Sequence, residues 1–235
     1  ADCGNSMSPT IERIITLSPD AIFMSPYEGG SYAQLENIGA AIIECADYME
    51  TSALGRAEWM RFYGMLTGKE NTARLAVRSH RTQLQNHRQR KQKAEETPES
   101  AHRTRHKWCM VLPRRQQFDA KLIKDAGGKY ISPTIIKSGS TKPFNPNGYQ
   151  QINRRDVWLF IYYGNRPLTR NELTAEYSGY KTIKAFKEGN IYECNGKTST
   201  YFEEISFRPD FLLEELTHIL HSPNSTLRYY KRISE

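Results

Sequence analysis

Apolar residues are grouped along the chain in two similar patterns. The first begins with the short apolar run PDAIFMS at 19–25 and continues through a Gly-rich stretch and an amphipathic segment ending at Gly39 to a second apolar run, AAIIECA. The second begins with RDVWLFIYY at 155–163 and continues through a polar loop and a segment ending at Gly189 to the run NIYECN. Short apolar runs bounded by turn residues are typical of buried strands, and glycine commonly ends a helix. Each pattern therefore predicts a strand, a loop, a helix and a second strand.

Strands that are apolar throughout and joined through helices indicate parallel sheets covered on both faces. The two patterns lie far apart in the sequence, so we expect two α/β lobes, each with its own small sheet. Ligands of such sheets bind outside the carboxyl ends of the strands. In this sequence those ends are SPYEGGSY in the first lobe and YYGNRP in the second.

Helices are expected between the two patterns and near the end of the chain. Ser52 is a good N-cap, and a helix from Ala53 should bury an apolar stripe before it ends at Gly68. That stripe is formed by Leu54, Trp59, Phe62, Tyr63 and Leu66. A second helix is expected from about Asn71, and RPDFLLEELTHILHS predicts an amphipathic helix that ends before Pro223.

The positive charge of the chain is confined to one segment. The net charge is +7, but the segment 78–115 holds 11 Lys/Arg and 3 Asp/Glu, a balance of +8, and the rest holds 22 and 23, a balance of −1. Only this segment therefore indicates contact with nucleic acid. Its one aromatic residue, Trp108, gives no row of stacking platforms, although its cations could still contact phosphates.

Motifs of the common enzyme and metal-site classes are absent from the sequence. It has no Gly-x-Ser-x-Gly, no Gly-Lys-Ser/Thr phosphate loop and no His-Glu-x-x-His. The four cysteines show no Cys-x-x-Cys spacing, and the six histidines form no metal-binding pattern. We therefore expect no enzyme, no catalytic residues, no metal site and no cofactor. No apolar run is long enough to cross a bilayer.

Six sequence blocks carry a resemblance to a known family. They are IERIITLSPDAIFMSPYEGG, IIECADYMETSALGRAEWMRFYGMLTGKE, LIKDAGGKYI, DVWLF, AFKEGNIYECN and EEISFRPDFLLEELTHILH. Their order resembles that of the periplasmic solute-binding proteins of bacterial ABC importers for iron-siderophore complexes, haem and cobalamin. The resemblance implies a two-lobed class III-type α/β fold with small parallel sheets flanked by helices, bridged by one long helix, and a solute held between the lobes. The corresponding domains are a partial N-terminal lobe at 1–70, a bridging helix and basic segment at 71–107, and a C-terminal lobe at 108–235.

Two departures from the family pattern raise further expectations. The family usually has an additional βα unit before the block that begins at Ile11, so the first lobe is expected to be incomplete and truncated at its N-terminus. Where relatives have a Gly-Gly-x-Ser turn, this chain has PRRQQ, and we hypothesise that about 77–119 is translated in a displaced reading frame. The alternative for this segment is a solvated, partly helical charged linker.

Candidate ligand-binding residues are those at the carboxyl ends of the predicted strands. Aromatic and arginine side chains there suit a large, flat, anionic ligand. Alternatives remain open: the first Gly-rich stretch as an ordinary βα loop, a local pair of Arg56 with Glu50, and a structural pair of Arg208 with Asp210. The candidates are Tyr27, Glu28, Tyr32, Tyr48, Glu50, Arg56, Tyr162, Tyr163, Arg166, Tyr201 and Arg208.

The predicted function is the receptor component of an ABC transporter that takes up an iron complex such as a ferric siderophore, haem or a corrinoid. The alternative is a nucleic-acid-binding or scaffold protein that acts through 78–115. The resemblance implies a permease partner, docked through Glu36. It also implies a periplasmic location, with a lipid anchor at Cys3 left open, contact with the membrane only through that anchor or the permease, and no nucleic-acid partner.

Overall fold

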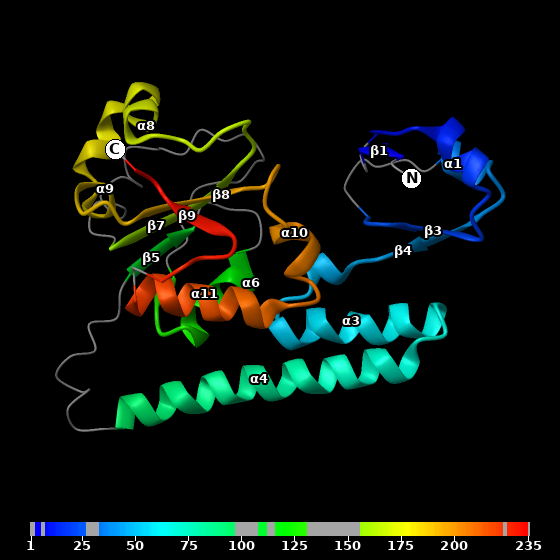
Figure 1. Cartoon of the computed structure of the whole chain (residues 1–235), viewed down its shortest axis with the longest axis horizontal. Helices are drawn as coiled ribbons and strands as arrows, with labels where there is room; N and C mark the ends of the chain where they lie inside the picture. The colour runs from blue at the N-terminus through cyan, green and yellow to red at the C-terminus, as the bar shows by residue number, and fades with distance from the viewer. Residues whose placement is uncertain are drawn as a thin grey trace. The chain divides into compact units, whose positions relative to one another are not determined.

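The computed structural model describes residues 3–5, 8–26, 33–96, 108–111, 116–130, 156–222 and 225–234. The chain divides into two compact units, Ala1–Met49 and Glu50–Glu235, both of which combine helices and strands (Figure 1). None of the helices in the described ranges has the length and apolar content needed to cross a membrane. The three-part division expected from the sequence stays a prediction.

The first unit is built around two parallel strands. β3 pairs with β4 from Ala21 opposite Ala41 to Met24 opposite Glu44, which confirms the predicted strand, helix and strand. Gly39, predicted to end the helix, has a φ of +81°, a conformation that glycine adopts without strain. The elements of this unit are β1 (Gly4–Asn5), β2 (Ser8–Pro9), α1 (Ile11–Leu17), β3 (Ala21–Met24), α2 (Ala33–Glu36), β4 (Ala41–Glu44) and η1 (Asp47–Met49).

The second unit begins with a helical hairpin of α3 (Ala53–Leu66) and α4 (Glu70–Glu96). The hydroxyl of Ser52 accepts a hydrogen bond from the backbone N–H of Gly55, at 3.0 Å, and so caps α3 as predicted. The two helices pack side by side (Figure 1). At Gly64 of α3, an added Cβ would lie 2.5 Å from the Cβ of Ala73 on α4. A glycine is therefore needed at this position for the hairpin to close.

The buried face of α3 differs from the predicted one. Its buried residues are Ala53, Arg56, Ala57 and Gly64, whereas the aromatic side chains are only half-buried and Leu66 is 42% exposed. Trp59 packs edge-on against Phe62, with ring centroids 5.6 Å apart. The prediction that the apolar stripe forms the core was therefore wrong for Leu66, because close packing against α4 selects the face with small residues.

Helix α4 buries a stripe of its own that runs into the start of the basic segment. Ala73, Val77, His80 and Leu84 recur at helical spacing and are all buried. The hypothesis of a displaced reading frame over about 77–119 stays a prediction about the gene, which resequencing tests.

A five-stranded sheet follows, in the order β6-β5-β7-β8-β9, with β9 antiparallel to β8 and the other pairs parallel. It is separate from the sheet of the first unit, so the expected fold class, with small sheets flanked by helices, is confirmed. The elements are β5 (Trp108–Val111), α6 (Gln116–Asp125), β6 (Lys129–Tyr130), β7 (Val157–Tyr162), α8 (Arg170–Glu176), η2 (Ser178–Thr182), α9 (Lys184–Lys187), β8 (Ile191–Asn195), α10 (Tyr201–Glu204), α11 (Pro209–His221) and β9 (Tyr230–Arg232).

Alternate residues of β7 face two hydrophobic clusters. Leu159 packs with residues of α6 and α11, whereas Trp158 packs with Phe186 and other residues of α8, η2 and α9. Trp158 is therefore buried in the sheet, as the sequence predicted. Helices cover both faces, so the polar groups that can meet a solute lie at the strand ends.

The end of the chain is held by a buried acid. The carboxylate of Glu215 on α11 accepts backbone hydrogen bonds from Arg228, Tyr229 and Tyr230, at 2.6 to 3.1 Å. These bonds hold the start of β9 against α11. Burial nevertheless raises the pKa of Glu215 above its ordinary value.

Candidate functional site

The candidate site of the second unit lies where β7 and β8 end. The two strands are parallel neighbours, with Tyr162 opposite Asn195, so both carboxyl ends meet at one edge of the sheet. The chain leaves β7 through Tyr163 and the loop before α8, and leaves β8 through Gly196 and the turn before α10. Side chains from the two loops can therefore act on one ligand.

Asn195 ties the two loops together. Its amide Nδ2 donates to the carbonyl of Gly164 at 2.8 Å and to the hydroxyl of Tyr162 at 3.2 Å, and its Oδ1 accepts from the backbone N–H of Lys197 at 3.0 Å. The hydroxyl of Tyr162 in turn donates to the carbonyl of Arg166. These bonds fix the loop that follows β7, and partial burial raises the pKa of Tyr162.

An exposed pair of stacked aromatic rings lies at the carboxyl ends of β7 and β8. The rings of Tyr163 and Phe202 are nearly parallel, with an interplanar angle of 6° and centroids 6.1 Å apart, and Tyr163 is 69% exposed. A Cβ added to Gly196 would lie 2.7 Å from Tyr163 Cε1 and 2.9 Å from Phe202 Cε2. The glycine thus makes room for both rings, and the stack offers a flat apolar face to a ligand.

Tyr201 is buried and packs against Phe202 of the stack. Its ring meets those of Phe202 and Tyr229 edge-on, at 5.2 and 5.6 Å between centroids. The structure therefore places Tyr201 in the hydrophobic core rather than on the exposed surface of the β7–β8 edge. Its contribution to binding would come through the position of Phe202.

Arg166 lies in the same loop but is engaged with an acid. Its guanidinium bonds to the carboxylate of Glu172, with Nη1 to Oε2 at 3.1 Å, and Glu172 also completes a capping box with Thr169 at the start of α8. These bonds lower the pKa of Glu172 to about 2. Arg166 therefore braces the loop, while most of its side chain stays exposed to solvent.

Two further candidates are arginines held by contacts within the fold. Arg208 binds Asp210 through Nε at 3.1 Å and Nη2 at 2.8 Å, and its guanidinium lies 3.4 Å from the centroid of the Phe211 ring. Arg56 is 1% exposed, donates from Nε to the carbonyl of Glu50 at 3.2 Å, and lies 3.4 Å from the centroid of Phe118. The structure does not bring either arginine to the β7–β8 edge.

Glu50 bonds within its own segment as well. Its carboxylate accepts from the indole N–H of Trp59 at 3.3 Å, and Arg56 contacts Glu50 locally through the backbone carbonyl rather than the carboxylate. In the first unit, the hydroxyl of Tyr48 donates to the carbonyl of Pro26, and Glu36 is exposed on α2. Tyr27, Glu28 and Tyr32 lie outside the described residues.

Comparison with known proteins gives the family of this chain. The family model described as periplasmic binding protein matches residues 1–198. The chain belongs to the periplasmic binding protein family. The family consists of binding proteins, so the prediction that the chain is not an enzyme is confirmed.

Relatives and solved structures agree with this assignment. An uncharacterized lipoprotein of Methanocaldococcus jannaschii is 26% identical over 228 residues, which are 94% of this chain and 52% of the lipoprotein, so this periplasmic binding protein spans about half the length of that relative. A periplasmic heme binding protein from Pseudomonas aeruginosa shares the fold with a TM-score of 0.68 and 12% identity, covering 99% of this chain and 84% of that one. The periplasmic heme-binding protein RhuT from Roseiflexus sp. RS-1 also has a TM-score of 0.68, with 17% identity, covering 94% and 82%.

Metal-binding and nucleophilic groups are the other chemistry to consider in the described ranges of this periplasmic binding protein. No group of three or more His, Cys, Asp or Glu among the described residues could hold a metal ion. The thiol of Cys194 lies in β8 close to the edge, but burial raises its pKa to about 12. It is therefore a packed thiol and not a nucleophile at neutral pH.

Sequence reasoning missed three residues of this edge in the periplasmic binding protein: Asn195, Gly196 and Phe202. The signal that could have found the first two is the string NIYECNG, which ends the strand paired with β7. A polar residue and a glycine at the carboxyl end of this strand indicate a place where a ligand can bind, as do the tyrosines at the end of the neighbouring strand. Phe202 could be found only by knowing how α10 folds back over the edge.

Proposed function

We propose that this periplasmic binding protein is the solute receptor of an ABC importer and carries an iron complex such as a ferric siderophore, haem or a corrinoid. The observation that carries the proposal is the exposed stack of Tyr163 on Phe202 at the carboxyl edge of β7 and β8. An aromatic face of this kind is costly to leave in water, and it suits a ligand with a flat, apolar surface. The family supplies the general role of solute binding.

Charge at the same edge supports an anionic ligand. Arg166 and Lys197 are both exposed in the loops that carry the stack. Arg166 is paired with Glu172, whereas the ammonium of Lys197 bonds to the uncharged amide oxygen of Asn165. Haem and many ferric chelates carry carboxylates or other negative oxygens, which arginine and lysine side chains bind through charge-assisted hydrogen bonds. A flat apolar face bordered by cations thus matches both parts of such a ligand.

The names of the similar structures support haem within this class. The Pseudomonas aeruginosa and Roseiflexus proteins are both described as heme-binding, and both share the fold over most of this chain. Their identity to this chain is low, so the proposal keeps the ferric siderophore and the corrinoid beside haem. The choice among the three is made by titration.

Partners and location follow from the proposed role. An ABC permease would meet the receptor through surface acids, of which Glu36 on α2 is the candidate in the first unit. The receptor would act in the periplasm, and the lipoprotein relative supports a lipid anchor, with Cys3 as its candidate site.

Equilibrium titration of the chain tests the proposal. Haem, a ferric hydroxamate siderophore and cobalamin are each added while the intrinsic tryptophan and tyrosine fluorescence is recorded. The proposal predicts saturable quenching by at least one of them at micromolar concentration or below, and no saturation by any of the three would contradict it. A parallel measurement on heparin tests the alternative: retention that disappears when 78–115 is deleted, with no solute bound, would favour a nucleic-acid binder.

A further inference from the structure

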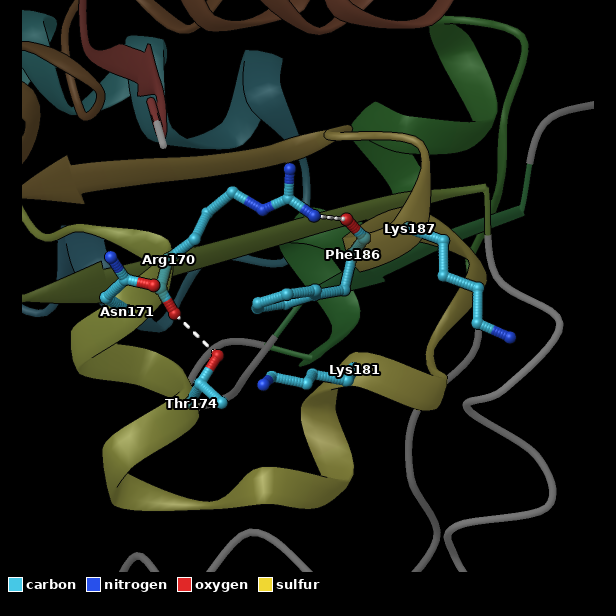
Figure 2. A pocket seen from close by; sticks show the side chains of 6 residues that line it. All are labelled: Arg170, Asn171, Thr174, Lys181, Phe186 and Lys187. Atoms are coloured by element: carbon cyan, nitrogen blue, oxygen red, sulfur yellow. Dashed lines mark hydrogen bonds between the residues drawn. The ribbon is translucent and has the colours of Figure 1, made fainter.

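A polar hollow of about 420 Å³ lies over α8, η2 and α9 in the second unit, on residues that take no part in the aromatic edge. Its size falls within the range of about 300–1,000 Å³ that is typical of sites for small ligands. Figure 2 shows the six side chains around it. They are Arg170, Asn171, Thr174, Lys181, Phe186 and Lys187.

The charge of the lining has one sign. Three of the six residues are cations and none is an acid. The nearby acids are bonded elsewhere or lie outside the lining: Glu172 binds Arg166, and Glu188 lies 3.8 Å from the ammonium of Lys184. An anion that enters the hollow therefore gains attraction from the cations of its lining.

Arg170 is held at the floor of the hollow by contacts with Phe186. Arg170 donates from Nη2 to the carbonyl of Phe186 at 2.5 Å, and its guanidinium lies 4.7 Å from the centroid of the Phe186 ring, which is itself buried in the core (Figure 2). The hydroxyl of Thr174 donates to the carbonyl of Arg170 at 2.8 Å. One cation is thus held in place before any ligand arrives, which reduces the entropy lost on binding.

The two lysines differ from Arg170 in having no partner within the described part of the chain. No hydrogen bond or ion pair to another described residue is formed by the ammonium of Lys181 or of Lys187. Lys181 extends toward Thr174, whereas Lys187 extends away from it on the other side of Phe186 (Figure 2). The amide of Asn171 is exposed at the rim and can donate as well.

We infer that this hollow is a binding site for a phosphate-bearing anion. A phosphate group offers several negative oxygens at once, and lysine ammonium groups and an arginine held in position are common donors to it. Lys181 is the principal ligand, Arg170 supplies the fixed charge and Lys187 adds attraction from the rim. The phosphate could belong to a free polyphosphate or to the headgroup of an anionic lipid, and the two sources share this chemistry.

Calorimetric titration of the whole chain at low ionic strength tests the inference in two arms. Sodium tripolyphosphate is the free probe, and vesicles of phosphatidylcholine with phosphatidylglycerol, compared with phosphatidylcholine alone, are the lipid probe. We expect saturable binding in one arm, weakened by about tenfold or more in the double variant Lys181→Gln/Lys187→Gln. The arm that binds identifies the source.

A matched control keeps the total charge equal. The double variant Lys69→Gln/Lys121→Gln removes two exposed lysines outside the lining, and it should bind as the unaltered chain does. Equal loss in both double variants would mean attraction to net charge only and would overturn the inference, as would binding in neither arm. Thermal unfolding of each variant verifies that it is folded. This experiment does not measure binding of haem, siderophore or cobalamin. A negative result for the phosphate site is therefore independent of the proposed receptor function.

Discussion

The ring of Tyr163 lies parallel to that of Phe202, although the two residues are held by different elements, one after β7 and one in α10. The turn that contains Gly196 brings them together, because any larger residue there would strike both rings. The edge of the sheet therefore displays an aromatic face where the two strands end.

Gly196→Ala should disturb the stack without unfolding the chain. The added Cβ would approach Tyr163 Cε1 to 2.7 Å, so the tyrosine ring must turn away from Phe202. We expect about a three- to tenfold loss of affinity for the solute, in line with the roughly 0.5–1.5 kcal/mol that aromatic pairs contribute. Fluorescence titration and near-ultraviolet circular dichroism measure the two effects. Thr198→Ala, an exposed change in the same turn, is the control, and unchanged affinity in Gly196→Ala would contradict this role.

Asp210→Asn should destabilise the second unit. The carboxylate of Asp210 is buried, binds Arg208 through two hydrogen bonds and lies 3.3 Å from Nδ1 of His80 on α4, so it connects α11 with α4. Removing one member of a buried pair leaves the others without compensation and costs about 3–5 kcal/mol, reduced here because Arg208 is partly exposed.

Urea unfolding measures this loss of stability. Glu214→Gln, on the same helix but exposed, is the control and should change the free energy of unfolding by less than about 0.5 kcal/mol. A loss in Asp210→Asn no larger than in the control would show that the connection between α4 and α11 contributes little.

Glu204 should give part of the stability a dependence on pH. Its carboxylate accepts from Nε and Nη2 of Arg228 and from the hydroxyl of Tyr229, at 2.7 to 2.8 Å, and the bonds from Arg228 lead in lowering its pKa from 4.5 to about 2. A folded-state pKa below the unfolded one means that ionised Glu204 stabilises the fold. The contribution is present above about pH 4.5 and is lost as the pH falls toward about 2.

Comparison of the chain with Glu204→Gln across this range measures that dependence. The difference in unfolding free energy should be largest at neutral pH and should shrink as the pH falls below about 4.5. Glu203→Gln, the exposed neighbour, serves as the control. A difference that stays constant from neutral to acidic pH would contradict the role given to Arg228.

The local elements could be predicted from the sequence because their signals are local. Ser52 before an apolar run, glycines at 39 and 189, and the runs at β7 and β8 each report on a few neighbouring residues, and the structure places elements there. The face that α3 buries could not be predicted in this way. It depends on how closely α4 approaches at Gly64, which no spacing within α3 reveals.

The candidate site was predictable where strand ends determine it and not where tertiary contacts do. Tyr162 and Tyr163 lie at the edge because they end β7, and their place follows from the apolar run before them. Arg56, Tyr201 and Arg208 have the right chemistry for a ligand, but packing on Phe118, burial beneath Phe202 and the pair with Asp210 occupy them. Whether such a residue contacts a ligand or has a structural role depends on its tertiary neighbours, which the local sequence does not reveal.

The role of the aromatic stack is measured by the dissociation constants of the chain and of Tyr163→Ala/Phe202→Ala for haem, a ferric siderophore and cobalamin. We expect at least one complex to bind the unaltered chain at micromolar concentration or below, and the double variant to bind it at least about tenfold more weakly. Tyr177→Ala, which removes an exposed tyrosine away from the edge, should bind it as the unaltered chain does. Equal affinity of the double variant and the unaltered chain, with both folded, would contradict a receptor that holds its solute at the β7–β8 edge.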